Sequence, residues 1–274
     1  MEIIRTTAQL QKAREGYTGS VGFVPTMGAL HEGHASLIRK AREENDIVIV
    51  SIFVNPTQFL EGEDLEAYPR REEADRKICE TAGVDILFMP TIDQMYAPDE
   101  LTIGAPAVRG YILEGAKRPG HFDGMLQIVM KLLNLTRPTR AYFGQKDAQQ
   151  LSLIEQMVRT YYLPVTIVPC PIVRDADGLA LSSRNAYLSP EEKQRALCLS
   201  RALKAGSDLI ARGERDASAI RRAMLEILAQ ADRIEYAQVV NRRFQPVETI
   251  ETGDTILLVA AWVGKPRLID NLWV

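Results

Sequence analysis

Cysteine and histidine are both scarce in this chain of 274 residues, at three residues each. Cys79, Cys170 and Cys198 lie far apart and form no C-x-x-C pair, which argues against a disulfide framework and against a zinc ribbon. The sequence also contains no Ser/His/Asp or Cys/His arrangement that would indicate a covalent nucleophile. We therefore do not expect chemistry that depends on a thiol or on a catalytic triad.

A charge excess of one sign and long apolar runs are missing as well. Lys and Arg number 33 against 36 Asp and Glu, so no global basic field favours nucleic acid as a partner. The longest apolar stretches, such as Ile47 to Val54, are far too short to cross a bilayer. The first ten residues lack the basic segment and apolar core of a signal peptide. We expect a cytoplasmic protein with neither nucleic acid nor membrane among its partners.

The first two-thirds of the chain alternate between strand-like and helix-like segments. The unbroken β-branched run Ile47–Val54 is typical of a strand that is covered on both faces. The predicted strands are Val21–Val24, Ile47–Val54, Val84–Met89, Ala141–Phe143 and Val165–Val168, and the predicted helices are Gly33–Glu44, Arg70–Ala82, Gly124–Leu135 and Ala148–Tyr162. This rhythm predicts an α/β fold with a doubly wound, mostly parallel, Rossmann-like sheet over residues 1–172.

The pattern changes after Pro169-Cys170-Pro171, where a smaller α+β domain is predicted over residues 173–274. Ser189 followed by Pro190 and two acids has the form of a helix N-cap. The expected elements are helices over Pro190–Ala211 and Ala217–Ala231 and strands over Glu235–Val240, Thr255–Val263 and Arg267–Leu272. We expect this domain to act as a lid.

The segment P-T-M-G-A-L-H-E-G-H, from Pro25 to His34, is the most informative in the chain. A strand that ends in a Pro/Gly turn and opens into a helix presents unpaired N–H groups and a positive dipole end, which suit an anion. Gly28 and Gly33 would let the backbone approach a nucleotide. His31 and His34 add donors over a phosphoryl group, although they could instead be capping or core residues. The spacing is not H-E-x-x-H, which argues against a metalloprotease.

Two more loops follow predicted strands, and the carboxyl ends of parallel strands share one edge of a sheet. Gln58, in Asn55–Phe59, can donate and accept, which suits a substrate with hydroxyl and carboxylate groups; the alternative is a plain turn. Lys146 is a candidate phosphate contact, and Gln150 lies one helical turn further on. Asp147, beside Lys146, could be an ordinary N-cap.

Two further segments are donor-rich. Val173–Asn185 ends in L-S-S-R-N, whose hydroxyls and Arg184 could wrap a triphosphate, although Asp177-Gly178 also suits a structural hairpin. Gly115–Gly124 is basic and rich in Gly and Pro, so it is either a plain loop or a mobile cover over an anionic substrate.

These segments together resemble the pantoate–β-alanine ligase family, within the wider group of HxGH nucleotidyl-transfer enzymes. The matching pieces, in family order, are P-T-M-G-A-L-H-E-G-H, S-I-F-V-N-P-T-Q-F, Y-P-R, K-R-P-G-H-F-D-G, F-G-Q-K-D-A-Q-Q-L and D-G-L-A-L-S-S-R-N. HxGH alone recurs in many adenylyl- and cytidylyltransferases, whereas S-I-F-V-N-P-T-Q-F and S-S-R-N are more specific. One departure is Gln145, where many members carry Glu.

The resemblance implies condensation of pantoate with β-alanine, with ATP and Mg²⁺, through a pantoyl-adenylate, by a homodimer. It implies that His34 is the acid catalyst, that Gln58 and Gln150 hold pantoate, and that Gln58 also borders β-alanine; it leaves the Mg²⁺ ligands unassigned. The implied ATP-binding residues are Met27, Gly28, Ala29, Leu30, His31, Glu32, Gly33, His34, Gly144, Gln145, Lys146, Asp147, Val173, Leu181, Ser182, Ser183 and Arg184.

Physical chemistry supports this mechanism, because a free carboxylate acylates poorly and an acyl-AMP has a good leaving group. Catalysis of phosphoryl transfer rests on positioning and electrostatics, so His31 and His34 are expected at the α-phosphate, and Lys146 and Arg184 at the polyphosphate. A nucleotidylyltransferase with a phosphorylated acceptor would share HxGH but need a second cationic cluster. A nucleotide-binding regulator would not need all four side chains, and a metal hydrolase is distant because no third ligand is suggested.

Overall fold

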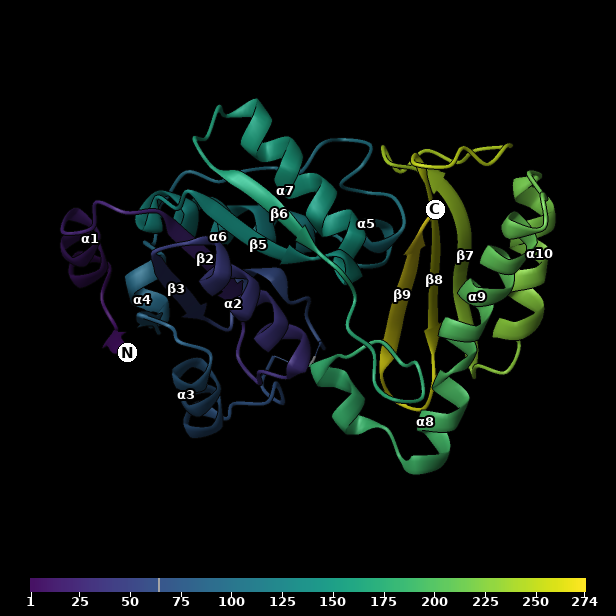
Figure 1. Ribbon diagram of the computed structural model, residues 1–274, viewed down its shortest axis with the longest axis horizontal. Coiled ribbons are helices and arrows are strands. Elements are labelled where there is room, and N and C mark those ends of the chain that lie inside the picture. Colours follow the sequence, from purple (N-terminus) through teal and green to yellow (C-terminus); the bar gives the residue numbers. More distant parts are fainter. Residues whose placement is uncertain (64) are drawn as a thin grey trace. The chain divides into compact units, whose positions relative to one another are not determined.

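The computed structural model describes residues 1–63 and 65–274, which form two compact units (Figure 1). The first unit comprises residues 1–145 and 153–171, and the second comprises residues 146–152 and 172–274. The predicted domain limits, 1–172 and 173–274, stay a prediction.

A parallel sheet organises the first unit, with the described strands in the order β1-β4-β3-β2-β5-β6. These strands are β1 (Glu2–Ile4), β2 (Val21–Thr26), β3 (Ile47–Ile52), β4 (Ile86–Phe88), β5 (Arg140–Gly144) and β6 (Thr166–Cys170). All of their pairings are parallel. The predicted doubly wound parallel sheet is confirmed, and β1 is an additional edge strand beside β4.

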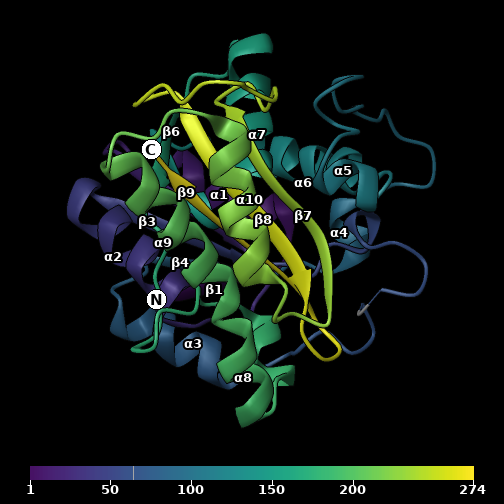
Figure 2. The ribbon, with the colours of Figure 1, turned by 90° about the vertical axis from the view of Figure 1, so that its right-hand side faces the viewer.

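Helices cover both faces of this sheet. The described helices of the unit are α1 (Thr7–Glu15), α2 (Glu32–Glu44), α3 (Glu72–Thr81), α4 (Ile92–Met95), α5 (Glu114–Lys117) and α6 (His121–Thr136), with α7 (Ala148–Thr160) starting in residues that group with the second unit. Figures 1 and 2 show α2 and α6 on opposite sides of the strands. This arrangement is what right-handed crossovers produce when the chain reverses direction across a sheet.

Apolar patterning explains why these segments adopt their conformations. Val48, Ile49 and Val50 in β3 have no exposed surface, as expected for a strand buried on both faces. On α2, the buried residues Ala35, Ile38 and Ala41 recur at intervals of three and form one apolar stripe.

The second unit is an antiparallel sheet, β7-β8-β9, with helices packed against it. Its elements are α8 (Pro190–Ala196), α9 (Cys198–Ala211), α10 (Ala217–Leu228), β7 (Arg233–Asn241), β8 (Thr255–Trp262) and β9 (Arg267–Trp273). Figure 2 shows α9 and α10 side by side against these strands. The predicted smaller α+β unit is therefore confirmed, but a single helix over Pro190–Ala211 is wrong. Leu197 interrupts it and separates α8 from α9, although its backbone angles (φ −60°, ψ −15°) stay in the right-handed helical region.

The Gly/Pro-rich segment Gly115–Gly124 also differs from expectation. It is not a plain loop, because α5 and the first turn of α6 fall within it. The alternative, a mobile cover over an anionic substrate, stays a prediction. Gly115, His121, Phe122 and Gly124 are buried. Glycine in the helices and proline between them concealed this packing from the sequence pattern.

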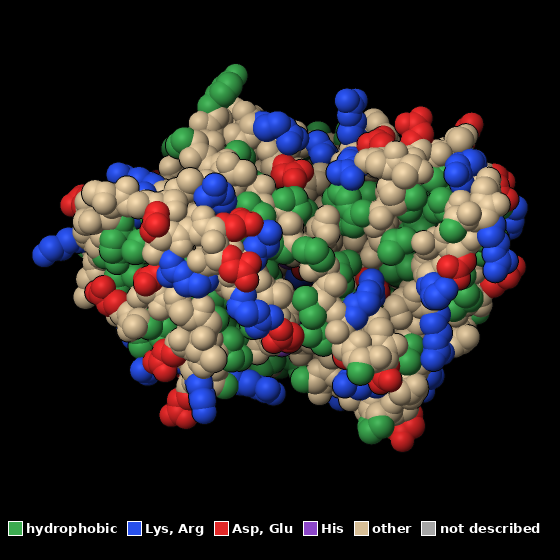
Figure 3. All heavy atoms as spheres, in the orientation of Figure 1, with side chains coloured by type: hydrophobic (Ala, Val, Ile, Leu, Met, Phe, Trp, Pro, Cys, Tyr) green, Lys and Arg blue, Asp and Glu red, His purple; other side chains and the backbone are tan. Residues whose placement is uncertain are grey.

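All three cysteines are buried free thiols. Burial raises the pKa of Cys79 to about 12 and that of both Cys170 and Cys198 to about 11. Within residues 1–63 and 65–274, no helix combines the length and the hydropathy needed to span a membrane. Figure 3 shows both signs of charge interspersed over one face of the molecule.

Candidate functional site

The order in which the chain adds strands to the sheet reverses at β2. The chain proceeds from β2 to β3 and β4 on one side, and then continues on the other side with β5 and β6. In open α/β sheets, ligands bind outside the carboxyl ends of the strands at such a switch point. The segment Met27–His34, called here the HxGH turn, follows β2, and Gly144-Gln145 lies at the carboxyl end of β5. The topology therefore supports the predicted location of a nucleotide site.

Close hydrogen bonds hold the turn that comes after β2. The Thr26 hydroxyl donates to the carbonyl of Ser51 on β3 (2.8 Å) and accepts from the amide of Gly28 (3.3 Å). The chain then reverses through two left-handed residues, Gly28 (φ +85°) and Ala29 (φ +50°). Left-handed geometry is uncommon for alanine, so the surroundings must stabilise this turn.

Asp75 on α3 provides that stabilisation. Its side chain is buried (2% exposed), and its two carboxylate oxygens accept from the amides of Ala29 (2.9 Å) and Leu30 (2.7 Å). Burial raises the pKa of Asp75 above its ordinary value, and the two amide hydrogen bonds partly offset this rise. We did not predict a role for Asp75. It shares the buried face of α3 with Cys79, and an acid on an apolar stripe is the signal that could have identified it.

His31 and His34 form a reciprocal cap on α2. The Nδ1 atom of His31 accepts from the amide of Gly33 (3.1 Å), and the Nδ1 atom of His34 accepts from the amide of His31 (3.3 Å). Their ring centroids lie 4.1 Å apart. The capping alternative is therefore confirmed as geometry. It is compatible with a ligand role, because a neutral imidazole that accepts at Nδ1 carries its proton on Nε2 and donates there.

Gln58 lies against the same turn. Its side chain is buried in η1 (Pro56–Gln58), and its Nε2 atom donates to Sδ of Met27 (3.0 Å). Its Oε1 atom accepts from Nδ2 of Asn55 (3.1 Å). The structure thus brings together a predicted pantoate residue and a predicted ATP-loop residue.

The backbone of Gln58 is held by the segment that the sequence suggested as a cover. His121 Nδ1 lies 2.7 Å from the carbonyl oxygen of Gln58, and Arg118 donates to the same oxygen (3.3 Å). Arg118 also forms a two-pronged pair with Glu63 at 2.6 Å for each bond. Burial alone would raise the pKa of Glu63, but the bonds and charge of Arg118 lower it below its ordinary value.

Gly124 on α6 completes this packing. A Cβ atom at this position would lie 2.2 Å from the carbonyl oxygen of Thr57 and 2.8 Å from the amide of Gln58. Only glycine allows α6 to approach η1 so closely. The predictions included none of these contacts, because they join residues more than 50 positions apart.

The remaining predicted residues belong to the second unit, apart from Gly144 and Gln145 at the end of β5. Lys146 Nζ lies 3.6 Å from a carboxylate oxygen of Asp147, and the Lys146 carbonyl accepts from Asn271 (2.8 Å). Lys146 lies in η2 (Gln145–Asp147), whereas Gln150 lies in the first turn of α7, so no single α-helix joins them. Their approach to the first-unit residues stays a prediction.

Val173 and Leu181 pair across a hairpin, where the amide of Leu181 donates to the Val173 carbonyl (2.9 Å). The Asp175 side chain accepts from the amides of Asp177 and Leu179, on either side of the left-handed Gly178 (φ +99°), so the hairpin alternative is confirmed. After it, Ser182 caps η3 (Ser183–Tyr187) by accepting from the amide of Arg184 (3.3 Å). Ser182, Ser183 and Arg184 therefore lie at the start of a short 3₁₀ helix.

Comparison with known proteins was decisive for the family. A family model described as pantoate-beta-alanine ligase matches residues 2–273. The chain is similar to the pantothenate synthetase of Aliarcobacter butzleri (strain RM4018), at 56% identity over 274 residues and the whole of both chains. It is also similar to the crystal structure of pantothenate synthetase from Thermus thermophilus, with a TM-score of 0.94, 43% identity and 99% of each chain covered. A third relative is the Francisella tularensis pantoate-beta-alanine ligase complexed with beta-gamma ATP and beta-alanine, with a TM-score of 0.83, 39% identity and coverage of 100% of this chain and 97% of that one.

Proposed function

The chain belongs to the pantoate–β-alanine ligase family, and on that premise we propose which of its residues serve each step of the reaction. The activity is the ATP-dependent condensation of pantoate with β-alanine to give pantothenate, through a pantoyl-adenylate and with release of AMP and pyrophosphate. The related Francisella tularensis structure was solved with an ATP analogue and β-alanine, and we propose that the same two ligands bind here.

One observation carries the assignment of residues. The HxGH turn and Gln58 meet in the first unit through the Gln58–Met27 contact of 3.0 Å, at the switch point of the sheet. A phosphate-binding turn and an amide suited to a small hydroxy acid are the two components that adenylation of pantoate requires. We propose that Gln58 and Gln150 hold pantoate and that Gln58 borders β-alanine.

In the first half-reaction, a pantoate carboxylate oxygen attacks the α-phosphorus of ATP and the bond to pyrophosphate breaks. Charge on the transferring group rests on its equatorial oxygens, so donors aimed at them stabilise the transition state. His31 and His34 donate through Nε2, the tautomer that their capping bonds favour. His34 is the proposed acid catalyst, and Lys146 and Arg184 neutralise the polyphosphate together with the Ser182 and Ser183 hydroxyls.

In the second half-reaction, the neutral amine of β-alanine attacks the acyl carbon and AMP leaves. The C–N bond of the amide forms as the C–O bond of the acyl phosphate breaks, AMP leaves with the electron pair of that bond, and the proton of the amine is released to solvent. A protein nucleophile is not required, because the adenylate is already activated.

We propose that Mg²⁺ binds together with ATP, at its phosphates. No group of three or more His, Cys, Asp or Glu side chains among the described residues could hold a metal ion, so these residues do not form a cage for it. Mg²⁺ in nucleotide sites commonly keeps several waters and binds substrate phosphates with one or two carboxylates. We also propose a cytoplasmic location and a homodimer. The proposals of Mg²⁺ and of the homodimer rest on the family resemblance.

Exchange of pyrophosphate into ATP tests the function directly. We expect exchange that depends on pantoate, and AMP release that requires both pantoate and β-alanine. A nucleotidylyltransferase with a phosphorylated acceptor would give no pantoate-dependent exchange, and a binding protein without turnover would give no AMP.

The variant His34→Ala tests the assignment of the catalytic acid. We expect a folded protein with modestly weakened ATP binding, and adenylate formation slower by about 10²- to 10³-fold, the usual cost of one lost transition-state donor. Single-turnover rates measured by rapid quench near those of the wild type would refute this role for His34.

A further inference from the structure

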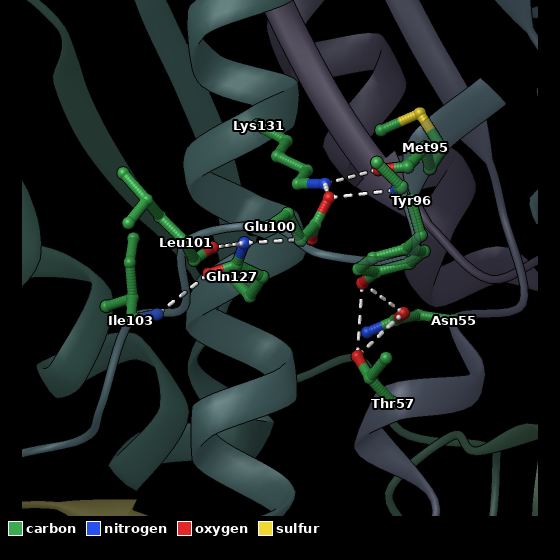
Figure 4. A network of polar contacts seen from close by, with 10 residues as sticks. Asn55, Thr57, Met95, Tyr96, Glu100, Leu101, Ile103, Gln127 and Lys131 are labelled. Atoms are coloured by element: carbon green, nitrogen blue, oxygen red, sulfur yellow. Dashed lines mark hydrogen bonds and ion pairs between the residues drawn. The ribbon is translucent and has the colours of Figure 1, made fainter. Parts of the chain in front are cut away.

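The side chain of Gln58 bonds to Asn55, which belongs to a larger polar network. Figure 4 shows Asn55 in this network with Tyr96 and Lys131, which the proposed reaction does not use. At its centre is the side-chain amide of Asn55, which is 1% exposed. Its Nδ2 atom donates to the carbonyl of Gly124 (3.1 Å) and to Oε1 of Gln58 (3.1 Å). Its Oδ1 atom accepts from the hydroxyls of Tyr96 (2.6 Å) and Thr57 (3.1 Å). All four hydrogen-bonding positions of the amide are therefore occupied.

These partners permit only one orientation of the Asn55 amide. The carbonyl of Gly124 can only accept, so it must face the amino group of Asn55. The reversed amide would place an oxygen against that carbonyl, and buried polar groups without partners are costly. The two hydroxyls donate to the opposite end and stabilise the same orientation.

The orientation of Asn55 determines that of Gln58. Because Asn55 presents an amino group, the Gln58 atom that faces it must be the accepting oxygen, Oε1. The amino group of Gln58 then points to the other side, toward Met27 and the HxGH turn. Gln58 therefore offers a hydrogen-bond donor to a ligand, which suits a carboxylate or an accepting hydroxyl oxygen.

Tyr96 is itself firmly placed. Its ring lies under Lys131, whose Nζ atom is 4.4 Å from the ring centroid, and 6.3 Å from the ring of Phe53. Lys131 is held by Glu100 (2.6 Å) and by the carbonyl of Met95. Burial raises the pKa of Tyr96, with a smaller rise from Glu100 and opposing hydrogen bonds from Thr57 and Asn55, so the hydroxyl remains protonated and able to donate.

We propose that Tyr96 is a positioning residue for pantoate, because it holds Asn55 in the orientation that turns the amino group of Gln58 toward the ligand. The proposal deepens the proposed function and rests on the role of Gln58 in pantoate binding. Thr57 supplies the second donor to Asn55, and its hydroxyl lies 3.1 Å from that of Tyr96.

The test compares steady-state constants in pantoate-dependent pyrophosphate exchange. For Tyr96→Phe, which removes only the hydroxyl, we expect the KM for pantoate to rise about 3- to 10-fold, the range for one lost hydrogen bond. For Tyr96→Phe combined with Thr57→Val, we expect a rise greater than the product of the two single effects, because Oδ1 of Asn55 then has no donor. The KM for ATP should change less than twofold in these two variants and in Thr57→Val alone.

Tyr142→Phe is the matched control. Tyr142 is another buried tyrosine of the first unit, its hydroxyl bonds to Asn45 (2.7 Å) and Glu44 (2.8 Å), and both partners lie at the far end of α2 from the HxGH turn. Its loss should lower the unfolding temperature without changing the KM for pantoate. A Tyr96→Phe variant that lowers the unfolding temperature and leaves the KM for pantoate unchanged would overturn the proposal.

Two substitutions of Gln58 separate the proposal from the function on which it rests. Gln58→Ala should raise the KM for pantoate. Gln58→Glu should raise it further, because glutamate replaces the amino group that faces the ligand by a negatively charged acceptor. If Gln58→Ala has no effect, the role of Gln58 and the proposal both fail. If Gln58→Ala is impaired but Gln58→Glu is not worse, the amide has the other orientation, and the proposal alone fails.

Discussion

Two helices in this molecule begin with the same reciprocal cap but use different side chains to build it. At α8, Ser189 accepts from the amide of Glu192 (3.2 Å), and Glu192 accepts from the amide of Ser189 (2.8 Å). At α2, imidazoles occupy both positions, with bonds of 3.1 and 3.3 Å. Serine and glutamate are the usual residues of a capping box, whereas histidine is not among the preferred N-cap residues. We propose that this difference reflects two purposes: the cap of α8 serves stability alone, and the cap of α2 serves the proposed chemistry as well.

Converting the cap of α2 into the cap of α8 gives the largest expected effect. The double variant His31→Ser with His34→Glu restores the usual capping box, so the free energy of unfolding should be unchanged or higher by up to about 1 kcal/mol. Adenylate formation should fall by more than about 10³-fold, because the two proposed donors to the transferring phosphoryl group are lost. Chemical denaturation and single-turnover assays measure the two effects. Full activity in this variant would show that the imidazoles are capping residues only.

Asp75→Asn tests a second feature of the turn before α2. This turn is held by the buried carboxylate of Asp75, which lies on α3. Asparagine keeps the shape but offers one accepting oxygen to two amides, so one amide of Ala29 or Leu30 faces another donor. We expect a loss of about 1–3 kcal/mol in the free energy of unfolding and a higher KM for ATP. Glu80→Gln, an exposed position on the same helix, is the control and should change neither quantity. An unchanged KM for ATP in Asp75→Asn would mean that the turn does not depend on this carboxylate.

Ser189→Ala tests whether the cap of α8 affects stability but not activity. Loss of the N-cap hydroxyl should cost about 1 kcal/mol in the free energy of unfolding, measured by urea denaturation. The rate of pyrophosphate exchange should stay within twofold of the wild type, because Ser189 serves only the helix. A large fall in that rate would remove the contrast between the two caps.

Acidification should give the smallest effect, at the first turn of α8. A bond to its own amide and a bond from the Ser189 hydroxyl (2.9 Å) lower the pKa of Glu191 below its ordinary value of 4.5. A lowered folded-state pKa stabilises the protein above the unfolded-state pKa, and this contribution is lost as the pH falls through the folded-state value. Glu191→Gln should therefore be slightly less stable than the wild type at pH 7 and equal to it in strong acid, as measured by thermal unfolding. A difference that does not depend on pH would contradict this.

Local patterns in the sequence were sufficient for much of the fold. The β-branched run of β3 and the apolar stripe of α2 each identify their element from neighbouring residues alone. The cap at Ser189 was predicted in the same way. The edge strand β1 has only three residues, Glu2–Ile4, which is too short for periodicity to appear.

The candidate site was harder to predict, because its supporting residues act over long separations. The HxGH motif marked the turn, but Asp75, which supports the turn, lies on α3, 45 positions from Leu30. His121, which contacts the backbone of Gln58, lies on α6, 63 positions from Gln58. Gly124 was predicted as the last residue of a Gly/Pro-rich segment and the first of a helix. Its packing constraint appears only in the structure, where a Cβ at this position would lie 2.2 Å from the carbonyl oxygen of Thr57. Contacts of this kind depend on tertiary structure, which composition and spacing do not encode.

The three buried thiols allow unfolding of this protein to be followed by labelling its native cysteines. A thiol whose pKa is about 11 or 12 contains almost no thiolate at neutral pH, so a maleimide can react only after the surrounding structure opens. Cys79 lies in the first unit and Cys198 in the second. Mass spectrometry of the labelled peptides would therefore give a separate opening rate for each half of the molecule without any engineered residue.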